Sequence, residues 1–342
     1  MTGSRSETST GLVDAYGRVA TDLRISLTDK CSLRCTYCMP AAGLDWLARD
    51  AVLTDDELDR LAGVFVGLGV DTIRLTGGEP LVRSGVPALI RRLAELGTEL
   101  SLTTNAIALA DQAADLAASG LHRVNVSLDT LDRNRFAELT RRDRLPQVLA
   151  GLAAAQQAGL APIKVNTVLL ADNLAEAPAM LEWALRQGYR LRFIEHMPLD
   201  ADHTWDRAAM VTAAAVLDRL SDEFHLQPQG DRGHAPAEEF VVTDGPSRAD
   251  WTGEDHRVGV IASVTRPFCR NCDRLRLTAD GQLRTCLFAH TETDLRAPLR
   301  AGVTDAGLAE LIRTAVAAKP AGHGINTAGF RQPARPMSAI GG

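Results

Sequence analysis

Residues 23–38, LRISLTDKCSLRCTYC, place a short apolar strand directly before three closely spaced cysteines. The run Leu23–Leu27 alternates apolar and polar residues, which predicts a β-strand. Cys31, Cys35 and Cys38 follow as C-x3-C-x2-C, a spacing typical of metal ligands. Three thiolates are one fewer than the ligands that fill a four-iron cluster or a closed zinc site, so such a cluster keeps one iron open for a further ligand.

Outward from this strand, short β-rich runs alternate with Ala/Leu-rich amphipathic stretches. This alternation predicts βαβ units and a parallel sheet, and about six units are fewer than the eight of a closed barrel. We therefore expect an α/β fold built as an open, partial parallel βα barrel. The predicted strands are Leu23–Leu27, Thr72–Leu75, Leu100–Thr103, Arg123–Leu128, Ile163–Leu169 and Leu191–Ile194, and the predicted helices are Asp55–Gly67, Val86–Leu96, Ala108–Ala118, Leu145–Ala158 and Leu174–Gln187.

The pattern weakens after about Trp205, which suggests a second, smaller module. The stretch Gln227–Arg257 is rich in Gly, Pro, Asp and His and is predicted to be a loop or connector. Strand-like runs follow at Val258–Val264 and Arg274–Leu277, and then a helix from about Asp305 to Ala318. We expect a core over residues 17–229 and a C-terminal module over residues 230–342.

The remaining three cysteines lie in this second module. Cys269, Cys272 and Cys286 form C-x2-C-x13-C, so all six cysteines of the chain belong to two trios. Trios pair badly into disulfides, but a C-x2-C pair is also a zinc signature. For the second trio, structural zinc and an iron–sulfur cluster both remain open from spacing alone; for the first trio, the flanking residues disfavour zinc.

Composition limits the possible partners. The chain has 342 residues, 45% hydrophobic and 23% charged, with a formal net charge of −6. This acidity does not favour a nucleic-acid partner, and no apolar run approaches the roughly 20 residues of a membrane helix, so we expect neither nucleic acid nor membrane binding. Reduced cysteines without an export signal favour the cytoplasm. The polar residues Met1–Thr10 are predicted to be a disordered leader.

Unusual residues follow the predicted strands, where parallel α/β folds collect their chemistry. Gly77 and Gly78 of a GGEP turn permit close approach of the backbone to a ligand. The carboxylates Asp129 and Glu195 end two strands, and both a catalytic and a capping role remain open. Ala106 ends the run TTNA, so we expect this turn to avoid a positive φ.

The cysteine loop with its aromatic residue Tyr37, followed by the GGEP turn, resembles the radical S-adenosylmethionine enzyme superfamily. Over roughly residues 17–342, the motifs RLTGGEPLVR, NVSLDT, KVNTV, RFIEHMP, FCRNCDRLRLTADGQLRTCL and the terminal IGG resemble the GTP 3′,8-cyclases of molybdenum cofactor biosynthesis. The resemblance implies two [4Fe–4S] clusters, S-adenosylmethionine as cofactor and GTP as substrate. It also implies that a 5′-deoxyadenosyl radical abstracts the ribose H3′, after which C3′ joins C8 of guanine.

The resemblance assigns roles to matching positions. Cys31, Cys35 and Cys38 hold the cluster that cleaves S-adenosylmethionine, and Cys269, Cys272 and Cys286 hold the auxiliary cluster. The implied S-adenosylmethionine contacts are Tyr37, Gly78, Ser127 and Met197. The implied GTP contacts are Arg24, Arg74, Thr103, Lys164, Arg274, Leu275 and Arg276, of which Arg274 and Arg276 are also implied in catalysis. Gly341–Gly342 is implied to reach back into the active site.

Thr72 stands where related cyclases usually carry Lys, which removes one candidate phosphate contact. The alternatives to a cyclase are a peptide-modifying radical enzyme with an auxiliary cluster and a zinc-binding nucleic-acid module. The family further implies a homodimer, an unidentified electron donor and a downstream cyclic pyranopterin monophosphate synthase.

Overall fold

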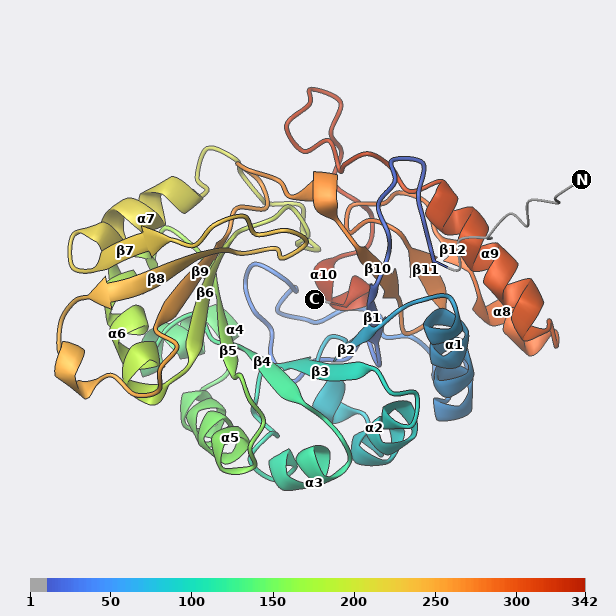
Figure 1. The fold of residues 1–342 in the computed structure, drawn as a ribbon, viewed down its shortest axis with the longest axis horizontal. Coiled ribbons are helices and arrows are strands. Elements are labelled where there is room, and N and C mark those ends of the chain that lie inside the picture. Colours follow the sequence, from blue (N-terminus) through green and yellow to red (C-terminus); the bar gives the residue numbers. More distant parts are fainter. Residues whose placement is uncertain (1–10, 342) are drawn as a thin grey trace, which may run out of the picture.

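One twelve-stranded sheet runs through the computed structural model, which describes residues 11–341 (Figure 1). The predicted leader Met1–Thr10 and the last residue, Gly342, lie outside the described residues. The strand order is β12-β11-β10-β1-β2-β3-β4-β5-β6-β9-β8-β7. The sheet curves around a central space, and its two edge strands, β12 and β7, lie at opposite ends of the order.

The six predicted strands form the middle of this sheet and pair in parallel in chain order, which confirms the open parallel βα arrangement. They are β1 (Asp22–Ser26), β2 (Thr72–Thr76), β3 (Glu99–Thr104), β4 (Arg123–Ser127), β5 (Lys164–Leu169) and β6 (Arg190–Glu195). Two further parallel strands extend it: β9 (Arg257–Ile261) beside β6, and β10 (Arg274–Leu277) beside β1.

Helices on the convex side cover the sheet (Figure 1). These are α1 (Asp55–Gly67), α2 (Val86–Ala94), α3 (Ala113–Ala118), α5 (Leu145–Gln157) and α6 (Ala177–Gln187). α1 begins as expected, because Thr54 and Glu57 form a reciprocal capping box. The other helices are α4 (Arg133–Thr140), α7 (Ala213–Ser221), α8 (Arg296–Arg300), α9 (Asp305–Ala317) and α10 (Met337–Ile340). Within residues 11–341, none of the helices has the length and apolarity required to cross a bilayer.

Side chains along the strands point alternately to the hydrophobic core and to the concave face of the sheet. Leu23 and Ile25 of β1, like Ile73 and Leu75 of β2, are fully buried in the hydrophobic core. The intervening side chains therefore face the concave side of the sheet, because successive strand residues point to opposite faces. This periodicity places polar residues on the inside of the curved sheet.

The prediction of a loop over Gln227–Arg257 is wrong in part. Strands β7 (His225–Pro228) and β8 (Glu238–Asp244) form an antiparallel pair that continues the sheet beyond β9. Only one of the seven residues of β8 is fully buried, so the strand lacks a strong alternating pattern. On the other edge, β11 (Gln282–Arg284) and β12 (Thr293–Asp294) extend the sheet in antiparallel fashion from β10. The module boundary at residues 229 and 230 stays a prediction.

The C-terminal tail returns to the middle of the molecule, where Figure 1 marks the C-terminus. The backbone N–H of Met337 donates to the carbonyl of Leu199, and the guanidinium of Arg276 donates to the carbonyl of Gly341. A Cβ atom on Gly341 would lie 2.4 Å from Oγ1 of Thr76, so this close approach requires a glycine. The tail therefore packs against the carboxyl ends of β1 and β2.

Candidate active site

A single cavity on the concave side of the sheet brings the two cysteine trios together. All six cysteines line it, and its volume is about 340 Å³, within the range of small-molecule sites. The cavity is bordered by the carboxyl ends of the parallel strands and by the C-terminal tail, which contributes Met337 and Ser338. The sequence places the two trios far apart, so their convergence is a property of the fold.

The first trio lies on the loop that follows β1. The backbone N–H of Leu33 donates to Sγ of Cys31 over 3.4 Å, and the side-chain amide of Asn105 lies 3.8 Å from the same sulfur. Burial, followed by the neighbouring Cys31, raises the pKa of Cys38 to about 12. Three thiolates in one buried site need a positive partner to ionise together, and iron ions supply that charge. The donor set therefore fits an iron–sulfur cluster.

The second trio lines the same cavity from the segments before β10 and after β11. Cys269 begins a short 3-10 turn at Cys269–Asn271, and Cys286 follows β11. Burial raises the pKa of Cys269 and of Cys286. Within residues 11–341, no three His, Cys, Asp or Glu side chains converge closely enough to hold a single metal ion, whereas an iron–sulfur cluster is held by thiolates spread around it. This trio also fits a cluster.

The predicted S-adenosylmethionine contacts lie beside the first trio. Tyr37, Gly78, Ser127 and Met197 all line the cavity. A Cβ atom on Gly78 would lie 2.5 Å from the carbonyl oxygen of Asp29, so only glycine allows the GGEP turn to pack against the cysteine loop. Met197 packs partly in a small apolar cluster near the C-terminal tail, so it serves the core as well as the cavity wall.

Two buried carboxylates fix the loops around these contacts. Asp129 accepts a hydrogen bond from the Tyr37 hydroxyl over 2.6 Å, and burial raises the pKa of Asp129 to about 6. Glu195 is fully buried and accepts hydrogen bonds of 2.8 Å from the backbone N–H groups of Ala213, Val264 and Thr265. Glu195 thus caps α7 and holds the loop after β9. Of the catalytic and capping roles considered for this residue, these contacts correspond to the capping role.

Three arginines form a row across neighbouring strands. Arg24 on β1 is the register partner of Arg74 on β2 and of Arg276 on β10, and all three line the cavity. Burial, and then the like charge of Arg74, lowers the pKa of Arg24 to about 9. Nε of Arg24 is buried and has no hydrogen-bond partner. An unpaired buried cation of this kind is typical of a site that awaits an anion.

The other predicted GTP contacts divide into two groups. Arg274 and Thr103 line the cavity. Lys164 is half-buried near the start of β5 and is not among the cavity-lining residues; burial and then Arg192 lower its pKa to about 7. The side chain of Leu275 is buried in the hydrophobic core, and Leu275 is not among the cavity-lining residues.

Further cavity residues were not singled out from the sequence. Asn125, Asn166 and Arg192 line the cavity from β4, β5 and β6, and Oδ1 of each asparagine is buried without a partner. Their alternation with apolar core residues along each strand is the signal that identifies them. Thr72, which replaces the usual Lys, donates its hydroxyl to Asp71 over 3.2 Å and contributes no charge.

The expectation for Ala106 is wrong. Its φ is +62°, in the left-handed region that costs a non-glycine residue roughly 1–2 kcal/mol. Local hydrogen bonds hold the turn: the N–H of Ala106 donates to Oγ1 of Thr104 over 3.0 Å, and the N–H of Ile107 donates to Oδ1 of Asn105 over 3.1 Å. These side-chain contacts stabilise the conformation that glycine adopts without strain.

Comparisons with known proteins agree with this geometry. The family model of the radical SAM superfamily matches residues 25–184, and the model described as Molybdenum Cofactor Synthesis C matches residues 189–325. Crystal structures of SuiB from Streptococcus suis, bound to its precursor peptide SuiA or to S-adenosylmethionine, have TM-scores of 0.64 and 0.59. They cover 94% and 95% of this chain and 76% of each of those chains, at 16% and 13% identity, and so show the fold alone.

Relatives of much higher identity cover nearly the whole chain. A GTP 3′,8-cyclase from Streptomyces coelicolor is 57% identical over 97% of this chain and 96% of its own length. A GTP 3′,8-cyclase from Mycolicibacterium smegmatis is 54% identical over 97% of this chain and 92% of its own. With both trios and the arginine row in one cavity, the chain belongs to the GTP 3′,8-cyclase family within the radical S-adenosylmethionine superfamily.

Proposed function

We propose that this chain is a GTP 3′,8-cyclase that converts GTP to (8S)-3′,8-cyclo-7,8-dihydroguanosine 5′-triphosphate, the first step of molybdenum cofactor biosynthesis. The observation that carries the proposal is the row Arg276–Arg24–Arg74 in the cavity that both cysteine trios line. The chain is acidic overall, with a net charge of −6, so this local concentration of positive charge needs an anionic ligand as its explanation.

The cofactors are two [4Fe–4S] clusters and S-adenosylmethionine. Cys31, Cys35 and Cys38 hold one cluster, and the second trio holds the other. When bound, these groups would supply a 5′-deoxyadenosyl radical as the hydrogen acceptor and an open iron to which guanine would coordinate. Tyr37 and Gly78 lie beside the first trio and provide backbone and an aromatic face to orient S-adenosylmethionine.

The arginine row binds the triphosphate. Guanidinium groups pair with phosphate oxygens through two parallel hydrogen bonds, which fixes both position and orientation. Arg276 also donates to the carbonyl of Gly341, so the same residue contacts the C-terminal tail and faces the substrate space. Arg274 is held by a 3.0 Å hydrogen bond to the carbonyl of His234 and by Phe268, whose ring centroid lies 4.6 Å from the guanidinium carbon.

The C-terminal tail also excludes water from the site. Ile340 and Gly341 are buried, so the tail covers the carboxyl ends of the inner strands. A closed site protects a radical from side reactions with solvent. We also place the protein in the cytoplasm as a homodimer that takes electrons from a separate donor and passes its product to a cyclic pyranopterin monophosphate synthase.

An anaerobic assay tests the proposal. The reconstituted protein is incubated with S-adenosylmethionine and a reductant, with and without GTP, and 5′-deoxyadenosine and nucleotide products are quantified by mass spectrometry. The proposal predicts formation of 5′-deoxyadenosine together with a cyclised GTP of unchanged mass. If S-adenosylmethionine is cleaved equally with and without GTP, the result contradicts the proposal and favours a peptide substrate instead.

A further inference from the structure

The segment Lys319–His323, which follows α9, wraps the second cysteine trio, and we call it the collar. Lys319, Gly322 and His323 line the cavity together with Cys269 and its two partners. A Cβ atom on Gly322 would lie 3.2 Å from Cβ and 3.5 Å from Sγ of Cys269, so the collar backbone lies directly against this cysteine.

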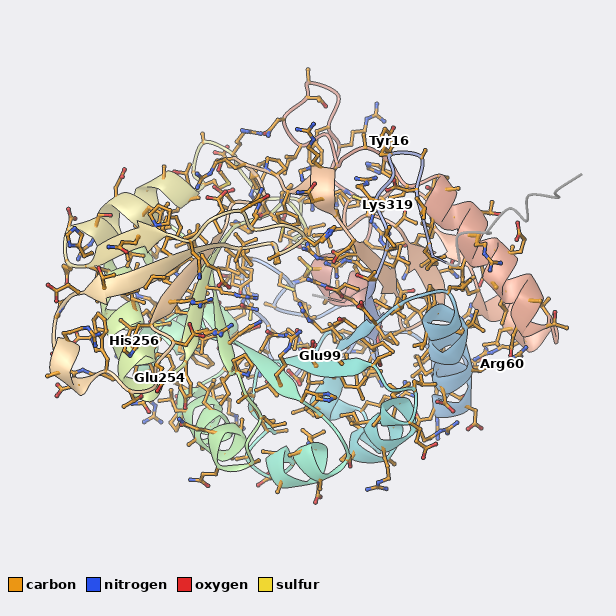
Figure 2. The ribbon with its side chains drawn as sticks, viewed as in Figure 1. Tyr16, Arg60, Glu99, Glu254, His256 and Lys319 are labelled. Carbon is orange, nitrogen blue, oxygen red and sulfur yellow. The ribbon has the colours of Figure 1, made fainter. Side chains whose placement is uncertain are left out.

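Lys319 is the charged member of the collar. Its side chain is buried, with the whole residue only 3% exposed, and Nζ donates to the carbonyls of Cys272 over 2.8 Å and of Arg274 over 2.9 Å. Figure 2 shows Lys319 in the same region as Tyr16, which lies in the turn closed by the antiparallel Val13–Val19 bridge, here called the N-terminal hairpin. Among residues 11–341, no carboxylate forms an ion pair with this ammonium group.

Arg18 of the N-terminal hairpin fixes the collar. Its guanidinium donates to the carbonyls of Cys269 over 2.7 Å, Ala321 over 2.9 Å and Pro320 over 2.6 Å, and it pairs with Asp14 over 2.5 Å. Because Asp14 balances the charge of Arg18, this pair acts mainly as a tether. The tether holds the collar backbone in place, and with it the ammonium group of Lys319.

Lys319 differs from the cations that await a phosphate. Two of its three N–H donors are used by the backbone carbonyls of Cys272 and Arg274, whereas Nε of Arg24 is buried without a partner. A buried ammonium without a carboxylate is costly unless another anion lies close. Asp14 of the N-terminal hairpin pairs with Arg18 and forms no ion pair with Lys319. A four-iron cluster held by three thiolates is anionic, so it supplies the missing charge.

We propose that Lys319 is a positioning residue that holds a fixed positive charge against the cluster at Cys269, Cys272 and Cys286 and raises the reduction potential of that cluster. Reduction adds negative charge to the cluster, and a cation held nearby in a buried site stabilises the reduced form. Lys319 Nζ donates to Cys272 and Arg274 and makes no hydrogen bond to the loop of Cys31, Cys35 and Cys38, so we expect the larger effect on the auxiliary cluster. The inference rests on the two-cluster site of the proposed function.

The test is an EPR-monitored redox titration of the reconstituted full-length protein, without GTP or S-adenosylmethionine. A Cys31→Ser, Cys35→Ser, Cys38→Ser background isolates the signal of the auxiliary cluster. Lys319→Met removes the charge and keeps an unbranched side chain, Lys319→Arg keeps the charge, and Arg313→Met removes a half-exposed cation of α9 as the matched control. Iron content is measured for each variant.

We expect Lys319→Met to lower the potential of the auxiliary cluster, with Lys319→Arg and Arg313→Met close to the parent protein. If Lys319→Met instead loses the iron of the auxiliary cluster while Lys319→Arg keeps both the iron and the potential, that result also supports Lys319 as the charge partner of the auxiliary cluster. An unchanged potential in iron-replete Lys319→Met overturns the inference, as does an equal shift or equal iron loss in Lys319→Arg. The redox titration contains no substrate. Its result can therefore be interpreted even if the protein does not turn over GTP.

Discussion

Arg24 and Arg276 occupy directly paired positions on the neighbouring parallel strands β1 and β10, with both side chains facing the cavity. Burial and the neighbouring arginines lower the pKa of Arg276 well below its usual value. Two like charges in register destabilise the ligand-free protein, so the pair stores an unfavourable interaction that an anion relieves.

Arg276→Met should weaken GTP binding by roughly 10- to 150-fold, because a hydrogen bond to a charged group contributes about 1.5–3 kcal/mol. Cyclisation should be lost while some cleavage of S-adenosylmethionine remains, since the first trio is untouched. Anaerobic binding titrations and product analysis measure both effects. Arg92→Met, which removes a partly exposed cation of α2, is the control. Loss of both activities together would contradict this division of roles.

Cys31→Ser and Cys269→Ser should each remove one cluster, lowering the iron content from about eight to about four per chain. The consequences differ, because the trios have different tasks. Cys31→Ser should abolish 5′-deoxyadenosine formation, whereas Cys269→Ser should keep some of it and lose the cyclised nucleotide. Iron assays and chromatography of the products check the pair, and identical product patterns from the two variants would refute the assignment.

GTP affinity should fall as the pH rises from 7 to 9.5. Lys164, with a pKa of about 7, and Arg24, with a pKa of about 9, lose their positive charge in this range in the free protein. A triphosphate binds the protonated forms, so affinity is highest below these pKa values and declines as the pH passes through them. Anaerobic calorimetry across the range measures the trend, and Lys164→Met should flatten its lower part. An affinity that stays constant or increases would be inconsistent with these cations as ligands.

Gly78→Ala should destabilise the protein by about 1–3 kcal/mol and weaken S-adenosylmethionine binding, because the added Cβ would overlap backbone carbonyls of the cysteine loop. Gly67→Ala is the matched control, since nothing lies within 4 Å of its added Cβ and Gly67, the last residue of α1, is not among the glycines with a positive φ. That control should be stabilising by roughly 0.4–1 kcal/mol. Thermal unfolding of the apo-protein measures both, and equal melting temperatures would contradict the close packing at Gly78.

The middle of the sheet could be predicted from the sequence because local patterns specify it. The strands β1 to β6 alternate with amphipathic helices, and Thr54 marks the start of α1. The placement of β9 and β10 at opposite edges of the parallel set could not be predicted this way. Parallel pairing such as that of Arg24 with Arg276 joins distant segments and leaves no local signal.

The candidate site was predictable where residue type and spacing carry the chemistry. Both trios are of this kind, whereas the resemblance to the cyclases indicated the arginines of β1, β2 and β10; all of these residues line the cavity. The proposed role of Lys319 could not be predicted, because a lysine after a helix is also typical of a helix C-terminus. At Ala106 the prediction was wrong because it used residue type alone. Alanine disfavours a positive φ, but the side chains of Thr104 and Asn105 stabilise this conformation through hydrogen bonds.

The most direct test of the proposed chemistry follows one hydrogen atom. GTP deuterated at C3′ is incubated anaerobically with the reconstituted protein, S-adenosylmethionine and a reductant, and 5′-deoxyadenosine is analysed by mass spectrometry. Our account predicts that deuterium appears in 5′-deoxyadenosine together with a cyclised nucleotide that has lost it from C3′. Turnover that yields only unlabelled 5′-deoxyadenosine would contradict abstraction of H3′ and, with it, the cyclase function.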